Sequence, residues 1–162
     1  MSYFEFLSLY WPRLMSGASV TIAQFLLGAI LTAGLALVFG LMKMSSNRAV
    51  KGSAVVYIEV FRGTSLLVQL YWIFFVLPLF GLTLEKFTAG WVAIGLNAGA
   101  YGAELVRGGI MAVPKGQWEA TTAINMSPAR RMRRIILPQA LVNMLPAWGS
   151  LMGEILKGTA LV

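Results

Sequence analysis

Long stretches of uncharged, mostly apolar residues alternate along the chain with short segments that carry nearly all of its lysines and arginines. A helix rises about 1.5 Å per residue, so about 20 apolar residues cross a hydrocarbon layer of about 30 Å. We therefore predict an all-α fold, a polytopic helical membrane bundle. Its four spans are expected at about residues 14–42, 55–84, 87–107 and 135–156.

The first 13 residues differ from the span that follows, because they are rich in aromatic side chains. Tyrosine and tryptophan prefer the headgroup layer of a bilayer. Pro12 is expected to turn the chain toward the first span. We accordingly divide the chain into an N-terminal interfacial segment (1–13) and a transmembrane domain (14–162). The aromatic residues of the first segment are Tyr3, Phe4, Phe6, Tyr10 and Trp11.

Composition supports a membrane protein and argues against an enzyme. Apolar residues make up 58% of the chain and charged residues 12%, whereas a soluble domain has about 25% charged residues. Cysteine and histidine are both absent, which removes thiol nucleophiles, histidine acid–base catalysis and the usual zinc ligands. The acidic residues are six glutamates, with no aspartate. We therefore predict no catalytic residues, no metal site and no cofactor.

The distribution of positive charge predicts a topology. Of the 13 lysines and arginines, ten lie in the segments between spans one and two and between spans three and four. Basic loops stay in the cytoplasm, so the N-terminus is expected outside. Topology also explains the net charge of +7 without a nucleic-acid partner. The chain stops after residue 162 without a polar tail, and we expect that at least one further span is missing.

The segment at residues 114–134 is predicted to form a helix, a sharp turn and a second helix. Asn125 tolerates a left-handed backbone and can close the first helix. Ser127 and Pro128 are typical of an N-cap and a first helical position. This unit could be a lever attached to the fourth span, or a basic interfacial anchor whose arginines meet anionic lipid headgroups; residues alone leave the two equal. The arginines are Arg130, Arg131, Arg133 and Arg134.

The spacing of this segment resembles the EAA loop of ABC importer permeases, which reads E-A-A, three spacers, G, nine spacers and I-x-L-P. Here Glu119-Ala120-Thr121 is followed at the same spacing by Asn125 and by Ile135-x-Leu137-Pro138. Thr121 replaces the third alanine and Asn125 replaces the glycine. Residues 57–69, 97–101, 104–109 and 113–119 are similar to permeases for polar amino acids, in which proline usually stands at Ser65. Residues 63–65, 124–138 and 156–162 are also similar to permeases for ectoine and hydroxyectoine.

The resemblance implies a type I ABC importer transmembrane domain in the inner membrane, which would have five spans. It implies four partners: a dimer of cytoplasmic ATP-binding subunits, a second permease subunit that is identical or homologous, an extracytoplasmic solute-binding protein, and the lipid bilayer. No G-x-x-x-x-G-K-[ST] loop is present, so the ATPase would be a separate chain. The solute would be a polar amino acid or a related zwitterion such as ectoine. Coupling to the ATPase would fall to Gln117, Trp118, Glu119, Ala120, Thr121, Ala123, Asn125, Ser127 and Pro128. The alternative is a secondary transporter or channel subunit driven by an ion gradient.

Polar residues inside predicted spans need an explanation, because charge in a membrane costs about 2.5–3.5 kcal/mol on insertion scales. Glu59 with Arg62, and Glu104 with Arg107, share an E-x-x-R-G spacing that puts both charges on one helical face. They are predicted to form a cross-helix network, either an inner gate or a static anchor. A solute path is expected at other polar positions, for which helix packing is the competing explanation. These are Gln69, Asn97, Tyr101 and Glu154.

Overall fold

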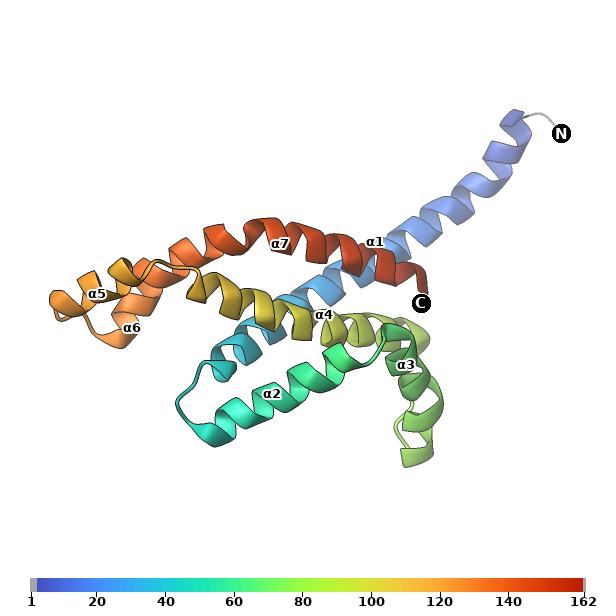
Figure 1. The fold of residues 1–162 in the computed structure, drawn as a ribbon. Helices are drawn as coiled ribbons and strands as arrows, with labels where there is room; N and C mark the ends of the chain where they lie inside the picture. The colour runs from blue at the N-terminus through green and yellow to red at the C-terminus, as the bar shows by residue number, and fades with distance from the viewer. Residues whose placement is uncertain (1–2, 162) are drawn as a thin grey trace.

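The computed structural model describes residues 3–161, with side chains from Tyr10 to Leu161, and no β-strand occurs in that part of the chain. The all-α prediction is confirmed (Figure 1). The principal helices are α1 (Tyr3–Lys43), α2 (Arg48–Gly63), α3 (Leu66–Tyr71), α4 (Lys86–Met111), α5 (Lys115–Ala123), α6 (Pro128–Arg131) and α7 (Leu137–Gly158). Shorter turns continue three of them: a π-helical turn Trp72–Val76 and a 3-10 turn Leu77–Phe80 after α3, a π-helical turn Met132–Ile136 between α6 and α7, and a 3-10 turn Thr159–Leu161.

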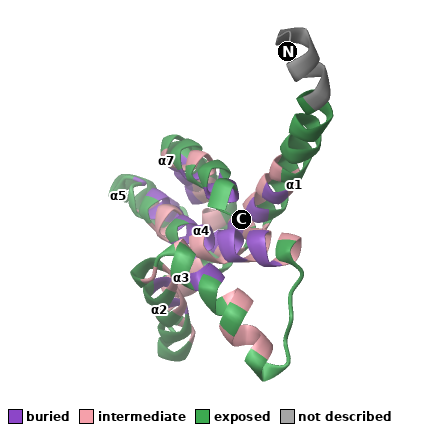
Figure 2. Cartoon of the chain, turned by 90° about the vertical axis from the view of Figure 1, so that its right-hand side faces the viewer, coloured by how far each residue is buried: buried purple, intermediate pink, exposed green. Residues whose placement is uncertain are grey.

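Helix α4 forms the centre of the bundle and packs along both α1 and α7 (Figures 1 and 2). Most of its buried residues are glycine or alanine. A Cβ at Gly95 would come within 2.6 Å of Leu31, and one at Gly102 within 2.7 Å of the Ala36 Cβ. Small side chains let helices approach closely where lipid supplies no hydrophobic drive for association. The core is therefore organised by close backbone contact around α4.

The predicted turn at Pro12 is wrong, because α1 is one helix from Tyr3 to Lys43 with Pro12 inside it. The residues from Tyr10 to Val20 are all exposed, and this part of α1 extends beyond the other helices (Figure 2). The φ of proline is fixed near the helical value, so the helix can continue past Pro12 with the loss of one backbone hydrogen bond. The side chains of Tyr3, Phe4 and Phe6 lie outside the described residues, and the interfacial role of residues 1–13 stays a prediction.

The predicted second span, residues 55–84, is not one straight helix. Helices α2 and α3 meet at Thr64 and Ser65, which are extended, and the chain bends there by 101°. Within the described residues, two helices are long and apolar enough to cross a bilayer: Tyr10–Lys43 and Pro128–Leu161. The bent pair would make a third. Helix α4 has 26 residues, about 39 Å at 1.5 Å per residue, but many are small or polar. The count of four spans stays a prediction.

Both basic connections lie at the same end of the bundle. In Figure 1 the link between α1 and α2 and the α5–α6 unit lie at the left, whereas the link from α3 to α4 and the C-terminal end lie at the right. The positive charges between spans therefore gather on one side of the molecule. Which side of a membrane this end faces stays a prediction.

Candidate functional site

Helix α5 is held to the bundle by one face only. Trp118 packs against the buried cluster formed by α4 and α7, and Thr121 is only 4% exposed, with its hydroxyl donating to the Trp118 carbonyl at 2.8 Å. Glu119, Ala120 and Ala123 are exposed. The threonine that replaces the motif's third alanine thus faces the core. The helix presents a small, acidic and largely unobstructed surface on its other side.

The turn after α5 is built by local backbone bonds around Asn125. This residue has φ +56°, the left-handed conformation that its identity predicted. The Met126 amide donates to the Thr121 carbonyl and the Asn125 amide to the Thr122 carbonyl, both at 3.0 Å. These two bonds form a Schellman motif, which satisfies carbonyls at a helix C-terminus. Ser127 then precedes α6, although its hydroxyl makes no capping bond.

Contacts between side chains tie α5 to the base of α7. The Arg131 guanidinium lies 6.0 Å from the centre of the Trp118 ring and donates to the Thr122 hydroxyl at 3.4 Å. The Gln139 amide donates to the Gln117 side-chain oxygen at 3.3 Å. Residues from Pro128 onward run through the π-helical turn directly into α7. Side-chain contacts and the continuous chain therefore both connect α5 to α7.

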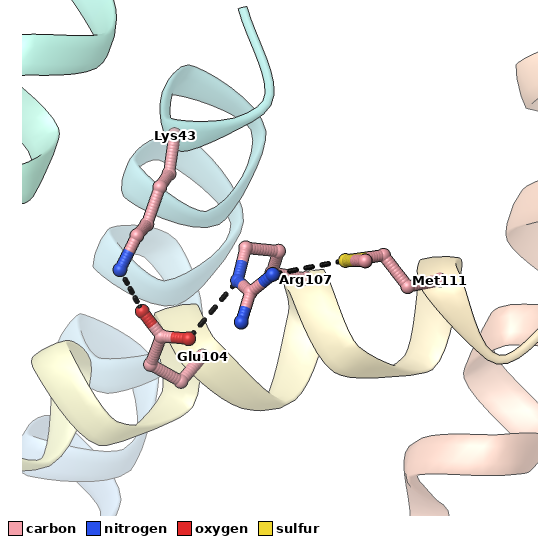
Figure 3. Close-up of polar contacts among 4 residues, drawn as sticks. All are labelled: Lys43, Glu104, Arg107 and Met111. Carbon is pink, nitrogen blue, oxygen red and sulfur yellow. Dashed lines mark hydrogen bonds and ion pairs between the residues drawn. The ribbon is translucent and has the colours of Figure 1, made fainter.

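A charged cluster joins α1 to α4 near the same end (Figure 3). Glu104 forms an ion pair with Lys43 through one carboxylate oxygen, and its other oxygen accepts from Arg107 Nε at 3.0 Å. Lys43 and Glu104 are each 18% exposed. Arg107 also donates to Met111 Sδ at 2.9 Å. The sequence analysis did not single out Lys43. Its position was a usable signal, because Lys43 directly follows the first apolar run and Glu104 lies near the end of the third.

Of the predicted network of Glu59, Arg62, Glu104 and Arg107, only the Glu104–Arg107 pair forms among the described residues. Arg62 lies over the Tyr101 ring, 5.3 Å from its centre. Glu59 is exposed and has no ion-pair partner among residues 10–161. Glu104 is instead neutralised by cations from α1 and its own helix. The shared E-x-x-R-G spacing in α2 and α4 could not show that Lys43, from α1, lies closer to Glu104 than the charges of α2 do.

Two of the expected path residues hold the break between α2 and α3. The Gln69 amide nitrogen donates to the Phe61 carbonyl at 3.0 Å and to the Thr64 hydroxyl at 2.8 Å. The Asn97 amide, from α4, donates to the same Phe61 carbonyl at 3.1 Å. The last carbonyls of a helix lack partners within it, so these amides satisfy a group that the break leaves free. For Asn97 and Gln69 the structure therefore shows a packing role.

Three of the four expected path residues border one hollow. Asn97, Tyr101 and Glu154 line a space of about 510 Å³ between α4 and α7. A neighbouring hollow of about 370 Å³ shares Tyr101 and Glu154 and is also bounded by Arg62 and Glu104. Glu154 pairs with Lys157 at 3.2 Å, and both are largely exposed. Cationic and anionic side chains therefore both border this pair of hollows. Gln69 lines a separate, apolar hollow.

Comparison with known proteins places this geometry in context. A family model described as "binding-protein-dependent transport system inner membrane component" matches residues 24–162. The chain is 47% identical over 159 residues to a probable amino-acid ABC transporter permease, y4tF, of Sinorhizobium fredii, covering 94% of this chain and 67% of that protein. It is 40% identical over 152 residues to the L-cystine transport system permease TcyB of Bacillus subtilis, covering 94% and 65%. It spans about two thirds of the length of these relatives. A crystal structure of an amino acid ABC transporter with histidines superposes with a TM-score of 0.90 at 42% identity, covering 99% of this chain and 75% of that one.

Proposed function

The chain belongs to the family of binding-protein-dependent transport system inner membrane components, and on that premise we propose that it forms the membrane-spanning permease part of an ATP-driven importer. The resemblance to amino-acid ABC permeases is confirmed by its relatives. In this proposal a dimer of separate ATP-binding subunits supplies the energy. A solute-binding protein delivers the solute outside the cytoplasm, and a second permease chain completes the path. The basic end of the bundle faces the cytoplasm, which leaves the N-terminus outside.

The exposed face of α5 is the observation that carries this proposal. Its inner face is fixed by Trp118 and Thr121, while Glu119, Ala120 and Ala123 remain open to a partner. An ATP-binding subunit that seats this face would move α5. Because Arg131 and Gln139 connect α5 to the start of α7, that movement would reach the helix lining the hollow.

Docking is tested by co-purifying the permease with its ATP-binding subunits from a membrane extract. Glu119→Lys and Ala120→Asp place a wrong charge on the exposed face without touching the buried one, so the ATP-binding subunit should be lost. Ser46→Lys, which adds a charge at an exposed position of the link between α1 and α2, is the matched control and should retain it. Stoichiometric ATPase on both α5 variants would show that this face is not the docking site.

The hollow between α4 and α7 suits a zwitterionic solute such as a polar amino acid or an ectoine-like compound. Arg62 supplies a cation and Glu154 a carboxylate at the borders of the adjoining spaces. An ionised solute leaves water readily where opposite charges replace its hydration. Glu154→Gln should weaken uptake of a zwitterionic amino acid while leaving the complex assembled. Unchanged uptake kinetics, measured with radiolabelled solute in proteoliposomes, would remove Glu154 from the path.

The Lys43–Glu104–Arg107 cluster is proposed to set the inner gate, with Arg62 over Tyr101 beside it. The competing role is a static link between α1 and α4. Exchanging the charges of Glu104 and Arg107 keeps the net charge but places a cation against Lys43. A gate predicts leaky or uncoupled ATP hydrolysis in the exchanged variant. Normal ATP-coupled uptake would favour the static link.

A secondary transporter driven by an ion gradient is the second candidate. It would account for the helices and the polar hollow, but gives α5 no task. Uptake in proteoliposomes that contain the binding protein separates the two proposals. The importer should need ATP and resist a protonophore, whereas a gradient-driven transporter would show the reverse dependence.

A further inference from the structure

The four arginines after the α5–α6 turn do not act alike. Arg131 turns inward, over Trp118 and onto the Thr122 hydroxyl. Arg130, Arg133 and Arg134 are exposed. Their spacing of three and four residues places them on neighbouring positions of one helical face. Together with Ser127 and Ala129 they line a hollow of about 460 Å³.

Nothing in the described part of the chain neutralises these three side chains. The ion pairs among residues 10–161 involve Lys43, Arg107 and Lys157 with two glutamates on α4 and α7. Among residues 10–161, no hydrogen bond engages the guanidinium groups of Arg130, Arg133 or Arg134. The Ser127 hydroxyl makes no capping bond either. Like charges at this spacing repel one another, so an anion bound among them would relieve that repulsion.

The hollow presents donors that match a phosphate. Arginine carries five N–H donors and no acceptor. Its planar fork binds phosphate oxygens in pairs, and it is more weakly hydrated than lysine. A serine hydroxyl adds one further donor. An anionic group with several oxygens is therefore the chemistry that this site would recognise.

Its place on the helix indicates where that phosphate comes from. The arginines lie in the first turns of Pro128–Leu161, a helix that is long and apolar enough to cross a membrane. Over the next turns the exposed residues of the helix are mostly apolar, including Leu141, Val142 and Leu145. A cationic hollow followed by an exposed apolar surface fits a lipid with its headgroup in the former and its acyl chains along the latter. Basic sites at the cytoplasmic ends of spans bind such headgroups.

We propose that Ser127, Arg130, Arg133 and Arg134 form a binding site for the headgroup of one anionic phospholipid of the leaflet that contacts the α5–α6 end. The lipid would neutralise these arginines beside α5, while Arg131 contacts α5 through Trp118 and Thr122. This site goes beyond the transport proposal, since lipid binding needs neither ATP nor solute.

Native mass spectrometry of the full chain in neutral detergent, titrated with phosphatidylglycerol or phosphatidylcholine, tests the site. Wild-type protein should bind one phosphatidylglycerol in preference to phosphatidylcholine. The triple variant Arg130→Gln, Arg133→Gln and Arg134→Gln should bind it about a hundredfold more weakly, given roughly 1 kcal/mol for each cation near an anionic surface. The triple lysine variant keeps the charge without the fork, so its affinity should lie between the two. It also guards against a folding defect in the glutamine variant.

A matched variant removes three other cations from the same end: Arg48→Gln, Lys51→Gln and Lys115→Gln, all exposed. It should bind phosphatidylglycerol as the wild type does. Equal weakening in both variants would show attraction by net charge alone and overturn the site. Displacement of the lipid by millimolar inorganic phosphate would mean that the site takes free phosphate instead. If the triple glutamine variant bound phosphatidylglycerol as the wild type does but lost the ATP-binding subunit, the three arginines would belong to a protein contact.

Discussion

Two of the breaks in the helical chain are made in different ways. At residues 124–127 the chain reverses between α5 and α6 through Asn125 in the left-handed region, with both Schellman bonds formed by backbone groups of neighbouring residues. At Thr64 and Ser65 the chain bends by 101° between α2 and α3. That bend is held by the amides of Gln69 and Asn97 on the Phe61 carbonyl. One break is stabilised locally and the other across helices.

The difference shows which kind of helix break can be predicted from the sequence. A residue that tolerates positive φ marks its own position, because the backbone preference belongs to that residue. Thr64 and Ser65, at the second break, are extended, a conformation that most residues adopt and that therefore marks no position. The bend there depends on Asn97, 36 residues away from Phe61 along the chain. We therefore expect the first break to respond to local changes and the second to changes on α4.

The largest effect should follow from removing both amides at the α2–α3 bend. With Gln69→Leu or Asn97→Leu alone, the Phe61 carbonyl keeps one donor. With both, it is left unpaired, and a buried unpaired polar group costs about 1–3 kcal/mol. Thermal unfolding in detergent should show the double variant losing more stability than the two single variants together. Asn143→Leu, at an exposed amide on α7, should change little. Strict additivity would show that the two amides do not share this task.

A smaller effect is expected at Asn125. Asn125→Val forces a β-branched residue to φ +56°, and the left-handed conformation costs such residues about 1–2 kcal/mol. The loss should be confined to the turn, with faster hydrogen exchange at the Asn125 and Met126 amides and little change in the unfolding temperature. Asn125→Gly keeps the conformation available and should exchange as slowly as the wild type. If the valine variant did the same, the turn would not be set by this residue.

The smallest effect separates the two serines that follow the breaks. The Ser65 hydroxyl accepts from the Val68 amide at 3.4 Å, a long capping bond, whereas that of Ser127 makes none. Ser65→Ala should cost about 0.5 kcal/mol, near the lower limit for N-caps. Ser127→Ala should leave stability unchanged. Equal losses in paired denaturation experiments would mean that the Ser127 hydroxyl caps α6 after all.

Some parts of the candidate site could be predicted from the sequence and others could not. The spacing from Glu119 to Pro138 located the α5–α6 unit, and Asn125 announced its turn. Glu104 and Arg107 were found from their place in an apolar run, but Lys43 was not, because pairing across helices depends on which helix faces which. Gly63, Thr64 and Ser65, a glycine followed by two residues that favour N-caps, were the one local indication of the α2–α3 bend.

Hydrophobic run length, basic-residue placement and a few backbone preferences fixed the helical class, the two basic connections and the turn at Asn125, since each acts over a helix or less. Only the packing of α1 and α2 against α4 decided that Glu104 pairs with Lys43, while Glu59 and Arg62 stay outside that cluster. It also made Gln69 and Asn97 structural, and separated Arg131 from its three neighbours. Those outcomes depend on distances between segments far apart in the chain, and no local preference specifies such a distance.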